Sequence, residues 1–131
     1  MRIRNQEVVV VEPMVAHPDD STEFYTPERC WILETWNDES DTDVSIARAR
    51  VESGVTTQLH TLDVAERYVI VAGTGTVSVG GLVSASVTVG DAVVIPANSP
   101  QQITNTGEDD LVFYCVCSPR FRPEGYRSLE K

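Results

Sequence analysis

The sequence predicts an all-β domain of the sandwich or barrel class. Apolar and β-branched residues occur in short, strand-sized runs, and clusters of Gly, Pro, Asn and Asp separate these runs. The runs recur about every 8–12 residues, a spacing typical of all-β folds. No long segment shows the 3.6-residue apolar period of an amphipathic helix. These observations argue against a helical bundle and against an alternating α/β fold.

The first expected element is an N-terminal arm, residues 1–28. Val8–Val11 forms an edge strand in this prediction, whereas His17–Ser21 and Tyr25–Pro27 are rich in loop-forming residues. A valine strand with a free edge would promote aggregation unless something covers it. We therefore expect a homodimer in which the arm packs across the interface.

Residues 29–131 are expected to form the barrel and a short C-terminal tail, with a core at about 44–118. Turn signals such as Gly73-Thr74-Gly75 and Gly90-Asp91 separate its strands. The expected strands are Cys30–Thr35, Val44–Val51, Arg67–Ala72, Thr76–Val79, Ser84–Val89, Ala92–Ile95, Gln101–Asn105 and Leu111–Cys117.

Length and charge limit the classes of partner. A chain of 131 residues suits one domain. Twenty acidic against ten basic residues give a net charge of -10, which disfavours a phosphate backbone, so we expect no nucleic-acid partner. No apolar stretch approaches the roughly 20 residues of a membrane span, and no secretory signal is evident. The expectation is a cytoplasmic protein without a membrane partner.

The cysteines and two arginines have expected orientations. An odd cysteine count without an export signal predicts reduced thiols. Cys115 and Cys117 alternate along one strand, so they share a face and are expected in the core. Arg48 and Arg50 share the face opposite that of Ala49. An inward orientation would offer two guanidinium groups to an anionic ligand, but the outside position, paired with surface acids, is expected.

The middle of the chain contains two sets of residues at regular spacings. The first set is Gly54, His60, Leu62, Glu66 and Gly73. The second set is Gly90, Pro96, Asn98, Gln101 and Asn105. Together they resemble the two motifs of the cupin family. The resemblance implies a small double-stranded β-helix, a jelly-roll barrel in which the two motifs face each other inside.

The resemblance also implies a metal site, which this chain changes at two positions. The usual cupin set takes two His and one Glu from the first motif and one His from the second. Here His60 and Glu66 match, but Leu62 and Gln101 replace two of the histidines. Leucine cannot coordinate, and an amide oxygen is a weak ligand for Zn²⁺, Ni²⁺ or Cu²⁺. His60, Glu66 and Gln101 could hold one divalent ion weakly, so a metal cofactor stays open.

Without a metal, the same positions suit acid–base chemistry. His60 and Glu66 could hydrogen-bond directly, and a carboxylate partner orients an imidazole as a general base. Burial would raise the pKa of Glu66 towards that of a general acid. Tyr68 is a further candidate for proton transfer, and Gln58 and Gln101 are candidates for orienting a ligand.

The expected function is binding of a small organic molecule inside the barrel. Acid–base or weakly metal-assisted turnover of the isomerase, lyase or dehydratase type could then occur at His60 and Glu66. The alternative is a non-catalytic ligand-sensing or accessory module that uses the same barrel. A metal-dependent oxygenase ranks third, because its two-histidine, one-carboxylate site cannot be assembled from these motif positions. The residues alone do not decide between an enzyme and a binding module.

Overall fold

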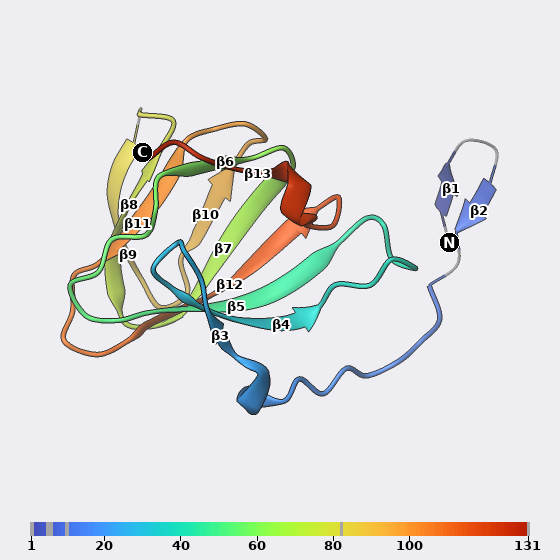
Figure 1. Ribbon diagram of the computed structural model, residues 1–131, viewed down its shortest axis with the longest axis horizontal. Helices are drawn as coiled ribbons and strands as arrows, with labels where there is room; N and C mark the ends of the chain where they lie inside the picture. The colour runs from blue at the N-terminus through green and yellow to red at the C-terminus, as the bar shows by residue number, and fades with distance from the viewer. Residues whose placement is uncertain (1, 5–6, 10, 82, 131) are drawn as a thin grey trace.

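The computed structural model describes residues 2–4, 7–9, 11–81 and 83–130 as a chain of short strands. Within these ranges the only helical segments are two 3₁₀ turns, η1 (Asp20–Thr22) and η2 (Pro123–Gly125). The prediction of an all-β fold is confirmed (Figure 1). Among the described residues, no helix is long and apolar enough to span a membrane.

Two antiparallel sheets face each other and form the body of the molecule (Figure 1). The six-stranded sheet has the order β10 (Ala92–Ile95), β7 (Ala65–Ala72), β12 (Leu111–Ser118), β5 (Ser45–Val51), β4 (Trp31–Trp36) and β3 (Phe24–Tyr25). The five-stranded sheet has the order β13 (Tyr126–Ser128), β6 (His60–Leu62), β11 (Gln101–Asn105), β8 (Thr74–Val79) and β9 (Val83–Thr88). From β5 onwards the chain passes repeatedly from one sheet to the other, as expected of a jelly roll.

Alternation along β7 shows how the strands sort their side chains. Glu66, Tyr68 and Ile70 point inward and are buried, whereas Val69 and Val71 are exposed. A strand places successive side chains on opposite faces, so one register decides the set that reaches the interior. Pairing with β12 places Glu66 opposite Cys117 and Tyr68 opposite Cys115. These two rows of side chains therefore meet inside the barrel.

One end of the barrel interior is closely packed with aliphatic side chains. Its fully or almost fully buried members are Val51, Ile70, Val77, Ile103 and Leu111. β-branched residues suit this position because they pack well on a pleated surface. Phe113 and Tyr68, whose ring centroids are 4.4 Å apart, lie between this packed end and the rest of the interior.

The N-terminal arm differs in part from its prediction. β1 (Arg2–Arg4) pairs with β2 (Glu7–Val9), so Val8 and Val9 pair within a local hairpin rather than with an edge of the barrel. Val10, within the predicted valine strand, lies outside the described residues. Figure 1 shows the hairpin at the far end of the extended segment 11–19. The homodimer stays a prediction.

The second half of the arm is attached to the barrel by ion pairs. Arg50 contacts Glu23 at 2.6 Å and Asp110 at 3.2 Å, and Arg48 contacts Asp20 and Glu23 at 3.4 and 3.5 Å. Both arginines therefore lie outside, as predicted, while Ala49 packs inside. The same contacts hold residues 20–23 against β5.

The predicted strands of the barrel are all present, and each boundary is either unchanged or shifted by no more than two residues. Three short strands of the barrel were not predicted: β3, β6 and β13. Each has two or three residues, which is too short for an alternating pattern to be recognised. β6 is nevertheless the strand that carries His60 and Leu62.

Candidate functional site

A cavity of about 440 Å³ lies inside the barrel, next to the packed end. Its apolar wall contains Phe24, Pro27, Ile32, Ala47, Ala49, Leu62, Phe113, Phe121 and Pro123. Its polar and ionisable wall residues are Thr26, Glu28, Cys30, Glu34, Ser45, Thr57, His60, Glu66, Tyr68, Cys115, Cys117 and Tyr126. A cavity that combines apolar side chains with several converging polar groups is typical of a small-molecule site.

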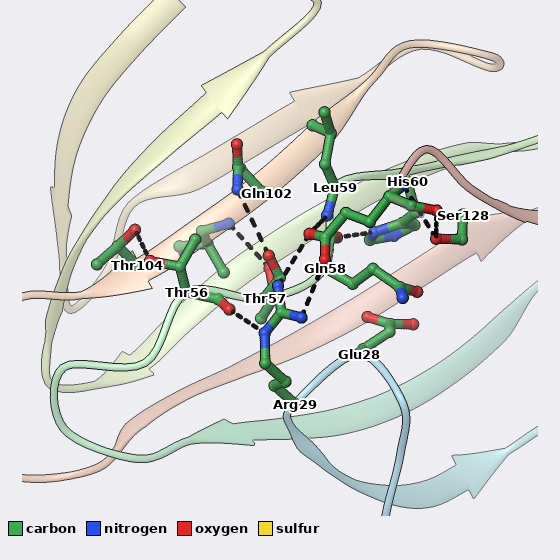
Figure 2. Close-up of polar contacts among 12 residues, drawn as sticks. Glu28, Arg29, Thr56, Thr57, Gln58, Leu59, His60, Gln102, Thr104 and Ser128 are labelled. Carbon is green, nitrogen blue, oxygen red and sulfur yellow. Dashed lines mark hydrogen bonds and ion pairs between the residues drawn. The ribbon is translucent and has the colours of Figure 1, made fainter.

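His60 lies on the cavity wall in a fixed orientation. Its ring is buried, with 3% exposure, and its Nδ1 is 2.7 Å from the carbonyl oxygen of Gln58 (Figure 2). A carbonyl oxygen only accepts, so Nδ1 is the donor in this contact, and Nε2 is the nitrogen on which the uncharged form of the ring keeps its lone pair. The Tyr126 ring stacks on the imidazole, with centroids 4.7 Å apart and planes 16° apart. Both contacts hold the imidazole in one orientation.

Gln58 and Tyr126 hold the His60 ring in place and also contact each other. The Tyr126 hydroxyl donates to Oε1 of Gln58, which joins the strand β13 to the segment before β6. The backbone N–H of Gln58 donates to the carbonyl of Glu28 at 2.9 Å. Gln58 does not itself line the cavity, so the structure places this predicted ligand-binding residue as a support for the His60 ring.

Glu66 reaches the cavity from β7 and is almost completely buried, with 6% exposure. Burial raises the pKa of Glu66 to about 7, and the Glu28 carboxyl adds to this rise, while Gln101, Cys115 and Cys117 partly oppose it. Its Oε1 has no hydrogen-bond partner within the described part of the chain, and its Oε2 is 3.8 Å from the sulfur of Cys117. Glu66 is therefore a buried carboxyl with one oxygen available to a ligand.

No hydrogen bond joins His60 to Glu66 in the described structure, although the sequence allowed one. The imidazole uses Nδ1 for the Gln58 carbonyl, and Oε1 of Glu66 is unpartnered. Both residues line the same cavity. A ligand between them could therefore contact an acid and a base separately.

Tyr68 and Gln101 form a pair beside Glu66. The Tyr68 hydroxyl donates to Oε1 of Gln101, and both side chains are buried. Burial raises the pKa of Tyr68 well above its ordinary value, so the phenol stays protonated. Tyr68 lines the cavity, whereas Gln101 does not. The predicted role of Gln101 in orienting a ligand would therefore act through the Tyr68 hydroxyl.

The donor set does not fit the metal implied by the family resemblance. Leu62 is buried, with 4% exposure, and lines the cavity where the second histidine would stand. Oε1 of Gln101 already accepts the Tyr68 hydroxyl. Within residues 2–4, 7–9, 11–81 and 83–130, no three His, Cys, Asp or Glu side chains are grouped as metal ligands would be. The remaining His60 and Glu66 provide too few donors for a cupin-type centre.

The three cysteines are free thiols on the cavity wall. Burial raises the pKa of Cys30 to about 12 and raises the pKa values of Cys115 and Cys117 well above the ordinary value. Each thiol therefore stays protonated and poorly nucleophilic near neutral pH. The prediction that Cys115 and Cys117 share an inward face is confirmed, although both line the cavity rather than filling the core completely.

Apart from the cysteines, three ionisable residues of the cavity wall were not predicted from the sequence. Glu28 comes from the turn before β4 and points towards the segment that carries Gln58 and His60 (Figure 2). Glu34 comes from β4, and Tyr126 from β13. Burial raises the pKa values of Glu28 and Glu34; the nearby His60 opposes the rise at Glu28, and Arg120 opposes it at Glu34. Only the odd placement of Glu34 among the apolar residues of Trp31–Trp36 was visible as a signal in the sequence.

Comparisons with known proteins agree with this architecture. The family described as Cupin domain matches residues 47–117. A sequence search of curated proteins found no match. The structure of Pac13, described as a unique nucleoside dehydratase, superimposes with a TM-score of 0.73 at 13% identity and covers 89% of this chain and 92% of its own. A variant of Streptomyces Pac13 with uridine has a TM-score of 0.69 at 14% identity, over 82% and 83% of the two chains.

Two further solved structures share the fold. KdgF from Halomonas sp. has a TM-score of 0.71 at 16% identity, over 82% of this chain and 96% of its own. Oxalate decarboxylase from Bacillus subtilis has a TM-score of 0.73 at 18% identity, over 90% of this chain but only 33% of its own. At such identities the likeness concerns the fold. The family match covers more than half of the chain, and the chain belongs to the cupin family.

Proposed function

We propose that the chain binds a small organic molecule in the barrel cavity and catalyses an acid–base reaction of the dehydratase, isomerase or lyase type. The observation that carries this proposal is that two groups suited to proton transfer line the same cavity. His60 has a tautomer that leaves Nε2 free to accept a proton, and Glu66 is buried with one unpartnered oxygen. General acid–base catalysis needs a proton acceptor and a proton donor that both reach the bound substrate.

A dehydration illustrates how the pair would work. Nε2 of His60 takes a proton from carbon, and protonated Glu66 gives its proton to the hydroxyl on the adjacent carbon. The C–H and C–O bonds break, a C=C bond forms, and water leaves. His60 ends protonated and Glu66 ends ionised, and exchange with solvent restores both. With a pKa of about 7, Glu66 is protonated in a large fraction of molecules at neutral pH.

The surroundings support the two roles. Apolar walls lower the local dielectric, which strengthens electrostatic contacts with a bound molecule. The Tyr68 hydroxyl provides a further polar contact held in place by Gln101. Among structures of the same fold, Pac13 is described as a nucleoside dehydratase, and one of its variants is described with uridine. Nucleosides and related sugars are therefore the first compounds to test.

The test combines binding with a chemical readout. A panel of nucleosides and deoxysugars is incubated with the protein in D₂O, and mass spectrometry follows loss of water and deuterium incorporation. Glu66→Gln and His60→Gln should each lower turnover by about 10²-fold or more. Glu108→Gln, on an exposed turn, is the matched control and should leave turnover unchanged.

Two outcomes would contradict the catalytic proposal. Turnover that survives in both cavity variants would remove His60 and Glu66 from the mechanism. A compound that binds in the cavity, yet shows neither loss of water, isomerisation nor deuterium exchange, would favour the alternative, a non-catalytic ligand-sensing module.

A further inference from the structure

The charges on the cavity wall are unevenly distributed. Three carboxyl side chains line the cavity: Glu28, Glu34 and Glu66. His60 is the only basic side chain among the described lining residues, which include neither Lys nor Arg. Glu66 is buried, Glu28 is half-buried and Glu34 is exposed, and the pKa of each is raised above its ordinary value by loss of solvation.

The arginines near the cavity are occupied elsewhere. Nη1 and Nη2 of Arg29 donate to the Glu130 carboxylate, at 3.0 and 2.9 Å, and its Nε donates to the Thr56 carbonyl (Figure 2). Arg120 donates from Nε to Oδ1 of Asn37 at 2.8 Å; it is close enough to oppose the pKa rise of Glu34 but does not line the cavity. No described arginine is thus positioned as the bidentate partner that carboxylate or phosphate ligands usually meet.

The unpartnered oxygen of Glu66 indicates what a ligand must bring. A buried carboxyl oxygen without a partner is energetically unfavourable. When Glu66 is ionised, an N–H or O–H donor on the ligand satisfies this oxygen; when Glu66 is protonated, it donates to a ligand oxygen, so a ligand hydroxyl suits both forms. An anionic group beside ionised Glu66 would instead add a second negative charge to the same cavity. This requirement is independent of Glu28 and Glu34, and it points to the same class of ligand.

The shape of the wall indicates the rest of the ligand. Phe24, Phe113, Phe121 and Tyr126 contribute aromatic surface to the cavity, and the Tyr126 ring is held against His60. Aromatic side chains pack well against flat rings. A volume of about 440 Å³ accommodates a ring compound with a short substituent.

We propose that the cavity takes a ring compound that carries an uncharged or protonated N–H or O–H donor for Glu66, and that it discriminates against anions. The inference rests on the proposed function, because it assigns the class of molecule that the same cavity binds. The decisive features are the unpartnered Glu66 oxygen and the absence of Lys and Arg from the described cavity wall.

Matched probes that differ only in charge test this class. Tyramine, 2-(4-hydroxyphenyl)ethanol and 4-hydroxyphenylacetate share a phenol ring and a two-carbon chain with a cationic, a neutral and an anionic end. Uridine and uridine 5′-monophosphate form a second pair. Dissociation constants are measured by isothermal titration calorimetry at constant ionic strength and pH 8, above the pKa of about 7 of Glu66.

We expect the anionic member of each set to bind at least tenfold more weakly than its neutral counterpart. The double variant Glu28→Gln/Glu34→Gln should reduce this ratio severalfold, because it removes two negative charges from the wall. Glu108→Gln, which changes net charge at an exposed turn, should leave the ratio unchanged and so controls for long-range effects.

The outcomes separate this inference from the proposed function. An anion that binds as tightly as its neutral partner would overturn the ligand class while leaving small-molecule binding intact. Discrimination that persists unchanged in the double variant would overturn the role of Glu28 and Glu34. If no probe of any charge binds, both the proposed function and the class inferred from it are contradicted.

Discussion

Two buried polar side chains, one at each end of the barrel interior, show how differently the fold treats them. Asn105, at the packed end, donates to the carbonyls of Val51 and Asp109 at 2.9 and 2.8 Å and accepts from the N–H of Gly107 at 2.9 Å. Glu66, at the cavity end, has one oxygen without any partner in the described structure and the other 3.8 Å from a thiol.

The difference teaches where the protein uses polarity for folding and where it keeps polarity for a ligand. Asn105 is 1% exposed and ties a loop to two strands, so its hydrogen bonds are part of the structure. Glu66 is almost as deeply buried but remains incompletely satisfied, which stability alone would disfavour. An unsatisfied buried carboxyl on a cavity wall is thus the stronger functional signal.

The largest expected effect tests the packed end. Asn105→Ala removes all three hydrogen bonds that this buried amide makes to the backbone, so we expect a loss of about 3 kcal/mol in the free energy of unfolding. Urea denaturation monitored by tryptophan fluorescence measures it. A loss below about 1 kcal/mol would contradict the structural role given to Asn105.

A glycine pair sharpens the description of that end. A Cβ at Gly73, where φ is +84°, would lie 2.7 Å from the backbone oxygen of Asp110. Gly54 has φ of +78° but nothing within 4 Å of the same position. Gly73→Ala should therefore destabilise by about 2–3 kcal/mol, and Gly54→Ala, the matched control, by only about 1 kcal/mol from backbone strain. Equal losses would show that the close approach to Asp110 is not important.

At the cavity end, Glu66 should make stability depend on pH. The pKa of Glu66 is about 7 in the folded chain, above its ordinary value of 4.5, so the folded form retains a proton that the unfolded chain releases. The retained proton therefore adds to the free energy of unfolding; this stabilisation is complete below about pH 4.5 and is lost as the pH rises through about 7. The melting temperature of the original protein should therefore fall between about pH 4.5 and 7. Glu66→Gln should remove much of this fall and should be no less stable than the original protein at pH 8. A smaller fall should remain, because the pKa values of Glu28 and Glu34 are also raised.

If the melting temperature of Glu66→Gln fell between pH 5 and 7 as steeply as that of the original protein, Glu66 would not titrate in this range. Glu52→Gln, an exposed carboxyl near Trp31, is the control and should preserve the full slope.

The smallest expected effect concerns the outer surface. Arg50→Ala removes contacts with Glu23 and Asp110, but solvent screens these partly exposed charges. We expect a loss of about 1 kcal/mol or less, measured by urea denaturation and reduced further at high salt. A loss above about 2 kcal/mol would mean that the contact between residues 20–23 and β5 is as important as the packed core.

Much of the fold could be predicted from alternation and turn residues, because both are local properties of the chain. Two-residue alternation also predicted that His60 and Leu62 share a face, and both line the cavity. Glu66 lies on another strand, and its inward position was implied by the resemblance to the cupin motifs. Very short strands escaped prediction because two or three residues show no period. The hairpin formed by Val8 and Val9 depends on a partner choice that the valine run alone does not specify.

The missed half of the site comes from long-range folding. Glu28 and Tyr126 lie far from His60 in the sequence, one before it and one after it. Glu28 reaches the cavity from a turn and Tyr126 from a short strand. The orientation of His60 likewise depends on a backbone carbonyl, which no side-chain motif shows. Gln58 and Gln101 were recognised as polar residues near the site, but tertiary contacts turn them towards Tyr126 and Tyr68.

The most direct test of the central claim is the titration of Glu66 itself. Protein labelled with ¹³C at glutamate carboxyl groups is followed by NMR from pH 4 to 9, and Glu66→Gln assigns the resonance. The structure predicts a Glu66 resonance that titrates near pH 7, as expected of a buried acid on a ligand cavity. A resonance that titrates near 4.5 would show a solvated carboxylate and contradict the acid–base site.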